Sequence, residues 1–264
     1  MAPEIPAGIS LQLSRVTTVL RAVLGDDIEG MILFGSAVDG GLKPHSDIDV
    51  LVLVHSPLSS GTRREIVDAL LLVSAPPGDD PDLRAVEVTV LRHDDVHPWR
   101  YPPTRELQFG EWERAEIDAG HYPRREVDPD LAIIITKARH HNVVLHGPSA
   151  EHLLPIVPTD DLLRALSDTI AQWQRPQDWE GDELTVVLAL ARLWYTAETG
   201  DIAAKDAAAS WALARLPDHL HPLLRMARAI YLGDARDELS SDPNALEDLI
   251  RALRVRVERA LDAP

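Results

Sequence analysis

Two acidic residues, Asp47 and Asp49, stand one residue apart in the segment FGSAVDGGLKPHSDIDV, where an apolar run begins. In a β-strand alternate side chains share one face, so both carboxylates lie on the same side, about 6.5 Å apart along the strand. Like charges at this distance repel each other, and a divalent cation held between them removes that cost. Carboxylate oxygens suit Mg²⁺, which often brings substrate phosphates with it. The spacing therefore predicts a magnesium site beside a phosphate.

A third acidic residue, Glu87, interrupts the valine-rich run RAVEVTVLR. Alternation places the valines of this run on one face and Glu87 on the other. A carboxylate inside an apolar strand is costly unless it faces a site. If this strand neighbours the one that carries Asp47 and Asp49, Glu87 joins them as a metal ligand, as the general base for a substrate hydroxyl, or as both.

Small and hydroxyl-bearing residues surround the aspartate pair. Gly35 and Ser36 follow an apolar run directly, and Ser46 immediately precedes Asp47. A glycine lets the backbone approach a ligand closely, and exposed amides with a hydroxyl can hold phosphate oxygens. An isolated Asp-x-Asp is usually a solvated turn. An Asp-x-Asp that follows a Gly-Ser loop and is joined by a lone Glu on a later strand is far more specific for a catalytic site.

The elements that must position these residues are predicted from the periodicity of apolar residues. The first half reads as mixed α/β, and the second half reads as helical to its end. The predicted strands are 30–34, 47–54 and 84–92, and the predicted helices of the first half are 11–25, 60–75, 104–120 and one within 129–147. The change in character predicts a domain boundary near residue 157, which gives domains 1–157 and 158–264.

Composition narrows the class of protein. The 264 residues contain no cysteine, which excludes disulfides, thiolate zinc ligands and a thiol nucleophile. The formal net charge is −17, which argues against nucleic-acid binding and fits a cationic small partner, although acidity alone also keeps a protein soluble. No signal peptide and no apolar run of membrane-spanning length is visible, so we expect a soluble, cytoplasmic monomer with no membrane partner.

The chain resembles the aminoglycoside 3''/9-adenylyltransferases, which inactivate streptomycin and spectinomycin and have a polymerase-beta-like nucleotidyltransferase fold. The resemblance runs from about residue 30 to about residue 233, and it rests on GSAVDGGLKPHSDIDV, EVTV, HPWRYP, RELQFGEWER, DLAIIITKAR, DWEGDE, RLWYTAETG and AKDAAASWA. It implies an α+β fold: an N-terminal nucleotidyltransferase domain with a mixed sheet, followed by a C-terminal α-helical bundle that binds the drug. It also implies that ATP and Mg²⁺ are required and that the drug is held between the two domains.

The resemblance assigns roles to individual positions. It places Asp47, Asp49 and Glu87 at the magnesium site, with Glu87 as general base. Trp112, Trp173, Asp178 and Asp182 match drug contacts, and Trp112 with Asp182 resembles the pair that supports streptomycin. Arg192 and Lys205 resemble residues that hold the ATP phosphates, and Asp130 and Tyr231 match positions near the nucleotide. Without the resemblance, we would interpret Lys205 as a solvated side chain and Arg192 as a side chain whose charged end extends to water.

Some features stay open. Trp173 and Trp179 lie in a polar loop with several acids, which favours exposed aromatics facing a cation, whereas Trp194 and Trp211 have the helical spacing of core residues. Leu184-Thr185 departs from the more polar residues of the family. The alternatives to the streptomycin and spectinomycin enzyme are a nucleotidyltransferase acting on another aminoglycoside or small metabolite, and a nucleotide-binding protein without activity.

Overall fold

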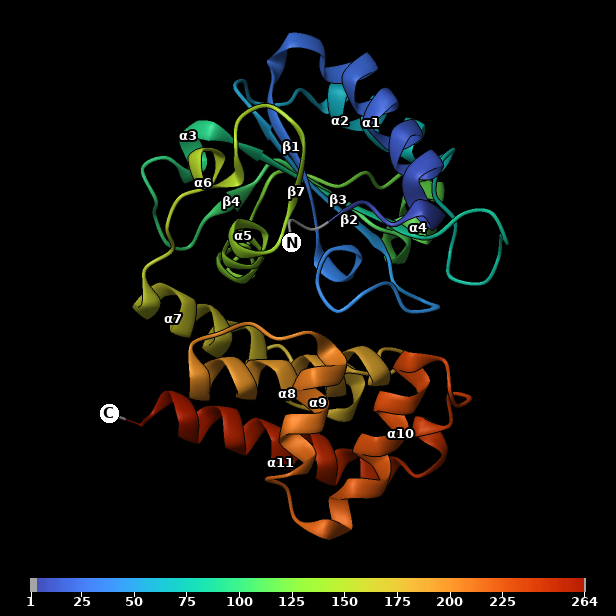
Figure 1. Cartoon of the computed structure of the whole chain (residues 1–264), viewed down its shortest axis with the longest axis vertical. Coiled ribbons are helices and arrows are strands. Elements are labelled where there is room, and N and C mark those ends of the chain that lie inside the picture. The colour runs from blue at the N-terminus through green and yellow to red at the C-terminus, as the bar shows by residue number, and fades with distance from the viewer. Residues whose placement is uncertain (1–3, 264) are drawn as a thin grey trace. The chain divides into compact units, whose positions relative to one another are not determined.

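The computed structural model describes residues 4–263. The chain divides into two compact units, Met1–Val157 (unit 1) and Pro158–Pro264 (unit 2). Unit 1 is built around a mixed sheet, whereas the regular structure of residues 158–263 is entirely helical (Figure 1). The predicted α+β fold class is therefore confirmed.

Unit 1 contains a five-stranded sheet in the order β5-β3-β2-β1-β7. Its strands are β1 (Ile28–Phe34), β2 (Ile48–Val54), β3 (Val86–Arg92), β5 (Leu107–Phe109) and β7 (Val143–His146). Strands β2 and β3 are parallel, and the other neighbours are antiparallel. A separate two-stranded pair joins β4 (Thr104–Arg105) to β6 (Glu126–Val127).

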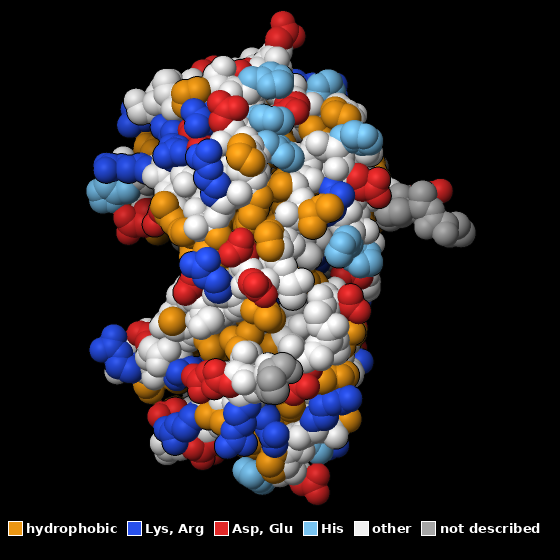
Figure 2. Space-filling view, turned by 90° about the vertical axis from the view of Figure 1, so that its left-hand side faces the viewer, with side chains coloured by type: hydrophobic (Ala, Val, Ile, Leu, Met, Phe, Trp, Pro, Cys, Tyr) orange, Lys and Arg blue, Asp and Glu red, His pale blue; other side chains and the backbone are white. Residues whose placement is uncertain are grey.

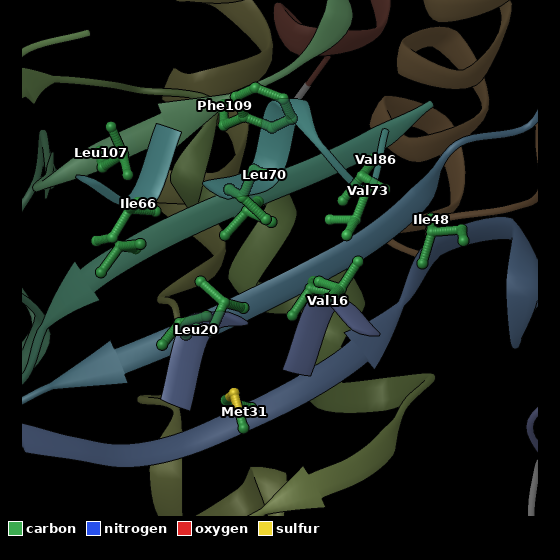
Figure 3. Packing of buried hydrophobic residues seen from close by; sticks show 14 of the residues in the cluster. Val16, Leu20, Met31, Ile48, Ile66, Leu70, Val73, Val86, Leu107 and Phe109 are labelled. Atoms are coloured by element: carbon green, nitrogen blue, oxygen red, sulfur yellow. The ribbon is translucent and has the colours of Figure 1, made fainter. Parts of the chain in front are cut away.

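Helices cover both faces of the sheet in unit 1. Helices α1 (Ser10–Leu24) and α2 (Ser60–Leu71) lie on one face, where Val16, Leu20 and Leu70 pack against strand residues such as Met31 and Val86 (Figure 3). Helices α5 (Leu131–His140) and α6 (Ala150–Leu153) pack on the opposite face, together with Val96 of the short helix α3 (His93–Val96), whereas the short helix α4 (Arg114–Asp118) contributes Ile117 to the core under α1 and α2. Alternate residues of one strand thus enter different cores.

Residues 158–263 of unit 2 form a bundle of five α-helices with one central member. The helices are α7 (Thr159–Ile170), α8 (Glu183–Thr199), α9 (Lys205–Leu213), α10 (His221–Leu232) and α11 (Pro243–Leu261). Helix α8 packs against α7, α9, α10 and α11, and its buried residues include Leu190 and Trp194. It ends at Gly200 and α10 ends at Gly233, with φ values of 75° and 83° that glycine adopts without strain.

Three of the predicted elements need correction. Residues 104–120 form β4, β5, a 3₁₀ turn and α4 instead of one helix, because Leu107 and Phe109 are buried on alternate positions where β5 pairs with β3. The segment 129–147 holds α5 and also β7. The predicted helix 60–75 ends earlier, as α2 at Leu71. The predicted strands 30–34, 47–54 and 84–92 and the helix 11–25 are confirmed within two residues at each end.

On the face shown in Figure 2, basic and acidic side chains are interspersed with apolar ones. Among residues 4–263 no helix has the length and apolarity needed to cross a membrane.

A buried carboxylate ties α2 to the strands. Glu106 has a fully buried side chain that bonds to Arg63 at 2.6 Å, to Arg125 at 2.9 Å and to the backbone N–H of Leu58 at 3.0 Å. The Arg63 side chain is only 14% exposed, so removal of its partner would leave a largely buried charge uncompensated.

We predict that Glu106→Ala lowers the free energy of unfolding by about 3 kcal/mol, because a largely buried ion pair loses one member. Urea denaturation measures this loss. The matched control is Glu126→Ala, which removes a 65% exposed partner of Arg105 and should cost less than about 1 kcal/mol. Equal losses in the two variants would contradict the role given to burial.

Candidate active site

The sheet brings the predicted carboxylates together. The parallel register of β2 and β3 pairs Asp49 with Glu87, and Asp47 immediately precedes β2. All three side chains are half-buried. The valines that alternate with them enter the core under α1 and α2, as the sequence predicts, so the carboxylates occupy the opposite face. Further along that face, Leu51 and Leu53 pack in the core that contains α5 and α6.

Gly35 lies directly against the second aspartate. Its φ is +73°, and a Cβ built on it would stand 1.7 Å from Asp49 Oδ2. The register of the antiparallel strands β1 and β2 explains this contact, because Phe34 is paired with Asp49. Only glycine fits here, since both the backbone conformation and the space exclude a side chain. The glycine thus fixes where the Asp49 carboxylate lies.

The loop between Gly35 and Asp47 is held by Arg84, two residues before β3. The Arg84 guanidinium donates to the carbonyl oxygens of Lys43, Pro44 and Ser46 at 2.8 to 3.1 Å. The Ser46 hydroxyl, 7% exposed, accepts from the N–H of Lys43 at 2.9 Å. Ser46 therefore has a structural contact within the loop, and its predicted contact with phosphate stays a prediction, as does that of the half-buried Ser36.

Glu87 has a hydrogen-bond partner that the sequence did not reveal. The Gln108 amide donates from Nε2 to Glu87 Oε1 at 3.1 Å, and both residues face the same way from neighbouring strands. This bond orients the Glu87 carboxylate through its Oε1 oxygen. Gln108 was missed because its segment was predicted to be helical. The alternation of buried Leu107, half-buried Gln108 and buried Phe109 is the signal that could have found it.

The donor set suits Mg²⁺. Among residues 4–263 no group of three or more His, Asp and Glu side chains is placed so that it could hold a metal ion. Mg²⁺ does not need such a group, because it keeps water ligands and is commonly held by one or two carboxylates together with substrate phosphates. Asp47 and Asp49 are the residues that would hold it, since Asp47 immediately precedes β2, Asp49 is its second residue, and Gly35 lies against Asp49.

Trp112 projects from the end of β5 with 55% of its surface exposed. Its ring covers Gly110, where an added Cβ would come within 2.2 Å of ring carbons. The neighbouring Glu111 is fixed by Arg114, which donates to both of its carboxylate oxygens at 2.6 and 2.9 Å. The position of the exposed ring therefore depends on the absence of a side chain at residue 110.

The loop that precedes α8 carries three of the predicted drug contacts. Trp173 is half-buried and Asp182 is exposed at the N-terminus of α8. The backbone N–H groups of Gln174 and Arg175 each donate to Asp178 at 2.8 Å and hold the pKa of its carboxyl below the usual value. Asp178 thus stays ionised. Trp179, in contrast, is only 6% exposed, so the expectation of two exposed aromatics in this loop is wrong for Trp179.

Unit 2 also groups the residues predicted to contact ATP. Lys205 is the first residue of α9, and its Nζ lies 5.8 Å from the ring centroid of Tyr231 on α10. Arg192 is half-buried on α8, which packs against both helices. In unit 1, Asp130 precedes α5, and its N–H donates to Asp128 at 3.0 Å.

The two tryptophans assigned to the core behave differently from the loop tryptophans. Trp194 is 2% exposed, and its ring lies edge-on to that of Trp211 at 4.9 Å, so both pack between helices of unit 2. Trp211 itself is half-buried and is covered by the Arg215 guanidinium at 4.0 Å.

Two family models match separate parts of the chain. Residues 152–256 match the family model "Aminoglycoside adenylyltransferase, C-terminal domain", and residues 20–90 match "Polymerase beta, Nucleotidyltransferase". The chain is 49% identical to an aminoglycoside (3'') (9) adenylyltransferase of Escherichia coli over 99% of both chains, and 37% identical to a spectinomycin 9-adenylyltransferase of Staphylococcus aureus over 99% of this chain and 100% of that one.

A solved structure shares the fold. The spectinomycin adenyltransferase of Enterococcus faecialis, crystallised with ATP and spectinomycin, is similar with a TM-score of 0.88 at 30% identity, over 94% of this chain and 98% of that one.

We predict that Gly35→Ala weakens Mg²⁺-dependent binding of ATP at least about tenfold, because the new Cβ displaces the Asp49 carboxylate. Titration calorimetry measures the affinity. Gly41→Ala is the matched control: Gly41 has a φ of +79° but nothing within 4 Å of its Cβ position. Both variants should lose about 1 to 3 kcal/mol of stability through backbone strain. ATP binding that falls equally in both would show that strain, and not the contact with Asp49, is responsible.

Proposed function

This chain belongs to the aminoglycoside (3'')(9) adenylyltransferase family, and we propose that it transfers AMP from ATP to a hydroxyl of streptomycin and of spectinomycin and releases pyrophosphate. The observation that carries the proposal is the register of β2 and β3, which sets Glu87 beside Asp49 on one face of the sheet. A metal-binding carboxylate and a candidate base stand together there, as transfer of a nucleotidyl group to an alcohol requires.

Each acidic residue has its own part in the proposed reaction. Asp47 and Asp49 hold Mg²⁺, which when bound offsets the charge of the triphosphate. Glu87, oriented by Gln108, accepts the proton of the drug hydroxyl as its oxygen attacks the α-phosphorus of ATP. The bond from that phosphorus to the bridging oxygen breaks, and pyrophosphate leaves with its electron pair. The backbone at Gly35 and the hydroxyls of Ser36 and Ser46 help to seat the phosphates.

Other half-buried and exposed residues are proposed to bind ATP and the drug. Arg192 and Lys205 neutralise phosphate charge, with Tyr231 beside Lys205 and with Asp130 near the nucleotide. The ionised Asp178 and the exposed Asp182 pair with the guanidinium or ammonium groups of the drugs. Trp112 and Trp173 offer aromatic faces to a sugar or a cation.

We predict that pyrophosphate is released from ATP and Mg²⁺ when either streptomycin or spectinomycin is present, and is not released without an acceptor. A coupled pyrophosphate assay measures this release. Release with neither drug would contradict the proposal and would favour another aminoglycoside or a small metabolite as acceptor. Asp49→Asn should abolish turnover, and Glu87→Gln should reduce kcat far more than it weakens ATP binding.

We predict that Gly110→Ala lowers kcat/KM for streptomycin at least about tenfold and leaves that for spectinomycin within about twofold. The added methyl group meets the Trp112 ring, and Trp112 is expected to support streptomycin in particular. Trp112→Ala is the reference variant and should show the same selectivity. Equal losses with both drugs in Gly110→Ala would contradict the selective role of this contact and would indicate general damage to β5.

A further inference from the structure

A cavity of about 750 Å³ in unit 1 has a wall unlike the rest of this acidic chain. It is lined by Ser60, Gly61, Arg63, Arg64, Gly120, Tyr122, Pro123, Arg124 and Arg125. Four of these residues are arginines and none is acidic, in a chain whose formal net charge is −17. Grouped cations repel one another unless anions are near, so this wall marks a place where negative charge is favoured.

The cavity lies away from the catalytic carboxylates. It is bordered by the first residues of α2, which follows the C-terminal end of β2, whereas Asp47 and Asp49 stand at the N-terminal start of β2. A strand of this length separates its ends by about 20 Å. None of the residues proposed above for ATP, metal or drug lines the cavity.

Buried acids satisfy two of the four arginines and hold them in place. Arg63 and Arg125 both bond to the buried Glu106, and Arg125 also bonds to Asp95 at 2.8 Å. These two guanidinium groups are therefore fixed in direction. Most of their positive charge is compensated by the Glu106 and Asp95 carboxylates, which do not line the cavity.

The other two arginines keep their charge for the cavity. Arg64 stacks over the Tyr122 ring at 4.5 Å, and the Tyr122 hydroxyl donates to Asp68 at 2.7 Å, which fixes the ring. Within residues 4–263 neither Arg64 nor Arg124 forms an ion pair, and both side chains are exposed. Two guanidinium groups without an ion-pair partner among residues 4–263 thus border the same space.

The start of α2 adds donors to this space. Ser60 and Gly61 open the twelve-residue helix, and the cap formed by the Ser59 hydroxyl uses the N–H of Thr62 and not theirs. The amides of a first helical turn favour anions, but here they only supplement the arginines. Planar guanidinium groups match the oxygens of a phosphate particularly well.

We propose that this arginine cavity binds a small molecule that carries a phosphate group, at a site separate from that of ATP. The two positive charges of Arg64 and Arg124 match a phosphate dianion, and the volume leaves room for an organic group attached to it.

Titration calorimetry without Mg²⁺ tests the proposal, with inorganic phosphate and glucose 6-phosphate as probes and with chloride used to keep the ionic strength constant. The wild type should bind both probes saturably. The double variant Arg64→Gln/Arg124→Gln should bind them at least about tenfold more weakly, because it loses two charge-assisted contacts. The control double variant Arg15→Gln/Arg259→Gln removes the same charge from two exposed arginines elsewhere and should bind like the wild type.

Two results would overturn the arginine cavity as a phosphate site. One is that neither probe saturates the wild type, and the other is that both double variants bind with the same affinity. The pyrophosphate assay with ATP and drug keeps this test apart from the proposed enzymatic function. Arg64→Gln/Arg124→Gln should retain wild-type turnover, since neither arginine belongs to the active site.

Discussion

The parallel pairing of β2 with β3 is the constraint on which the site depends. It sets Asp49 opposite Glu87, at the spacing of about 4.8 Å between neighbouring strands. Like charges directly opposite each other destabilise a sheet. The pairing is held instead by residues on both faces: Val50 and Val88 are completely buried beneath α1 and α2, and Leu51 is completely buried on the other side. The apolar cores therefore stabilise an arrangement of carboxylates that would not form by itself.

The same pairing dictates the rest of unit 1. Two parallel strands need a long crossover connection, and here α2 supplies it between β2 and β3 while covering one face of the sheet. The antiparallel neighbour β1 then delivers Gly35 to Asp49, because Phe34 is the register partner of Asp49. On the other edge, β5 delivers Gln108 to Glu87. One helix and two flanking strands thus suffice to place the two carboxylates and the groups that orient them.

The alternation of apolar and polar residues predicts which face of a strand each side chain occupies. The alternation in DIDVLVLV and EVTV placed Asp49 and Glu87 opposite the valine face, and the buried strands confirm those faces. The segment RELQFGEWER was beyond such reasoning, because Glu, Leu, Gln and Arg all favour helices and only the pairing with β3 makes part of it a strand. Arg84 was missed for a related reason: its three acceptors are backbone carbonyls of a distant loop, which leave no trace in side-chain spacing.

Two glycines also show what the sequence alone could not predict. The sequence predicted that Gly35 permits close approach, but it indicated a phosphate as the group that approaches. The structure places the Asp49 carboxylate there, so the neighbour that requires a glycine at residue 35 is a side chain of the protein itself. Gly110 lies in the segment 104–120 that the sequence predicts to be helical, whereas its missing side chain makes room for the Trp112 ring. In both places the residue type was informative, and only the fold could say which neighbour required it.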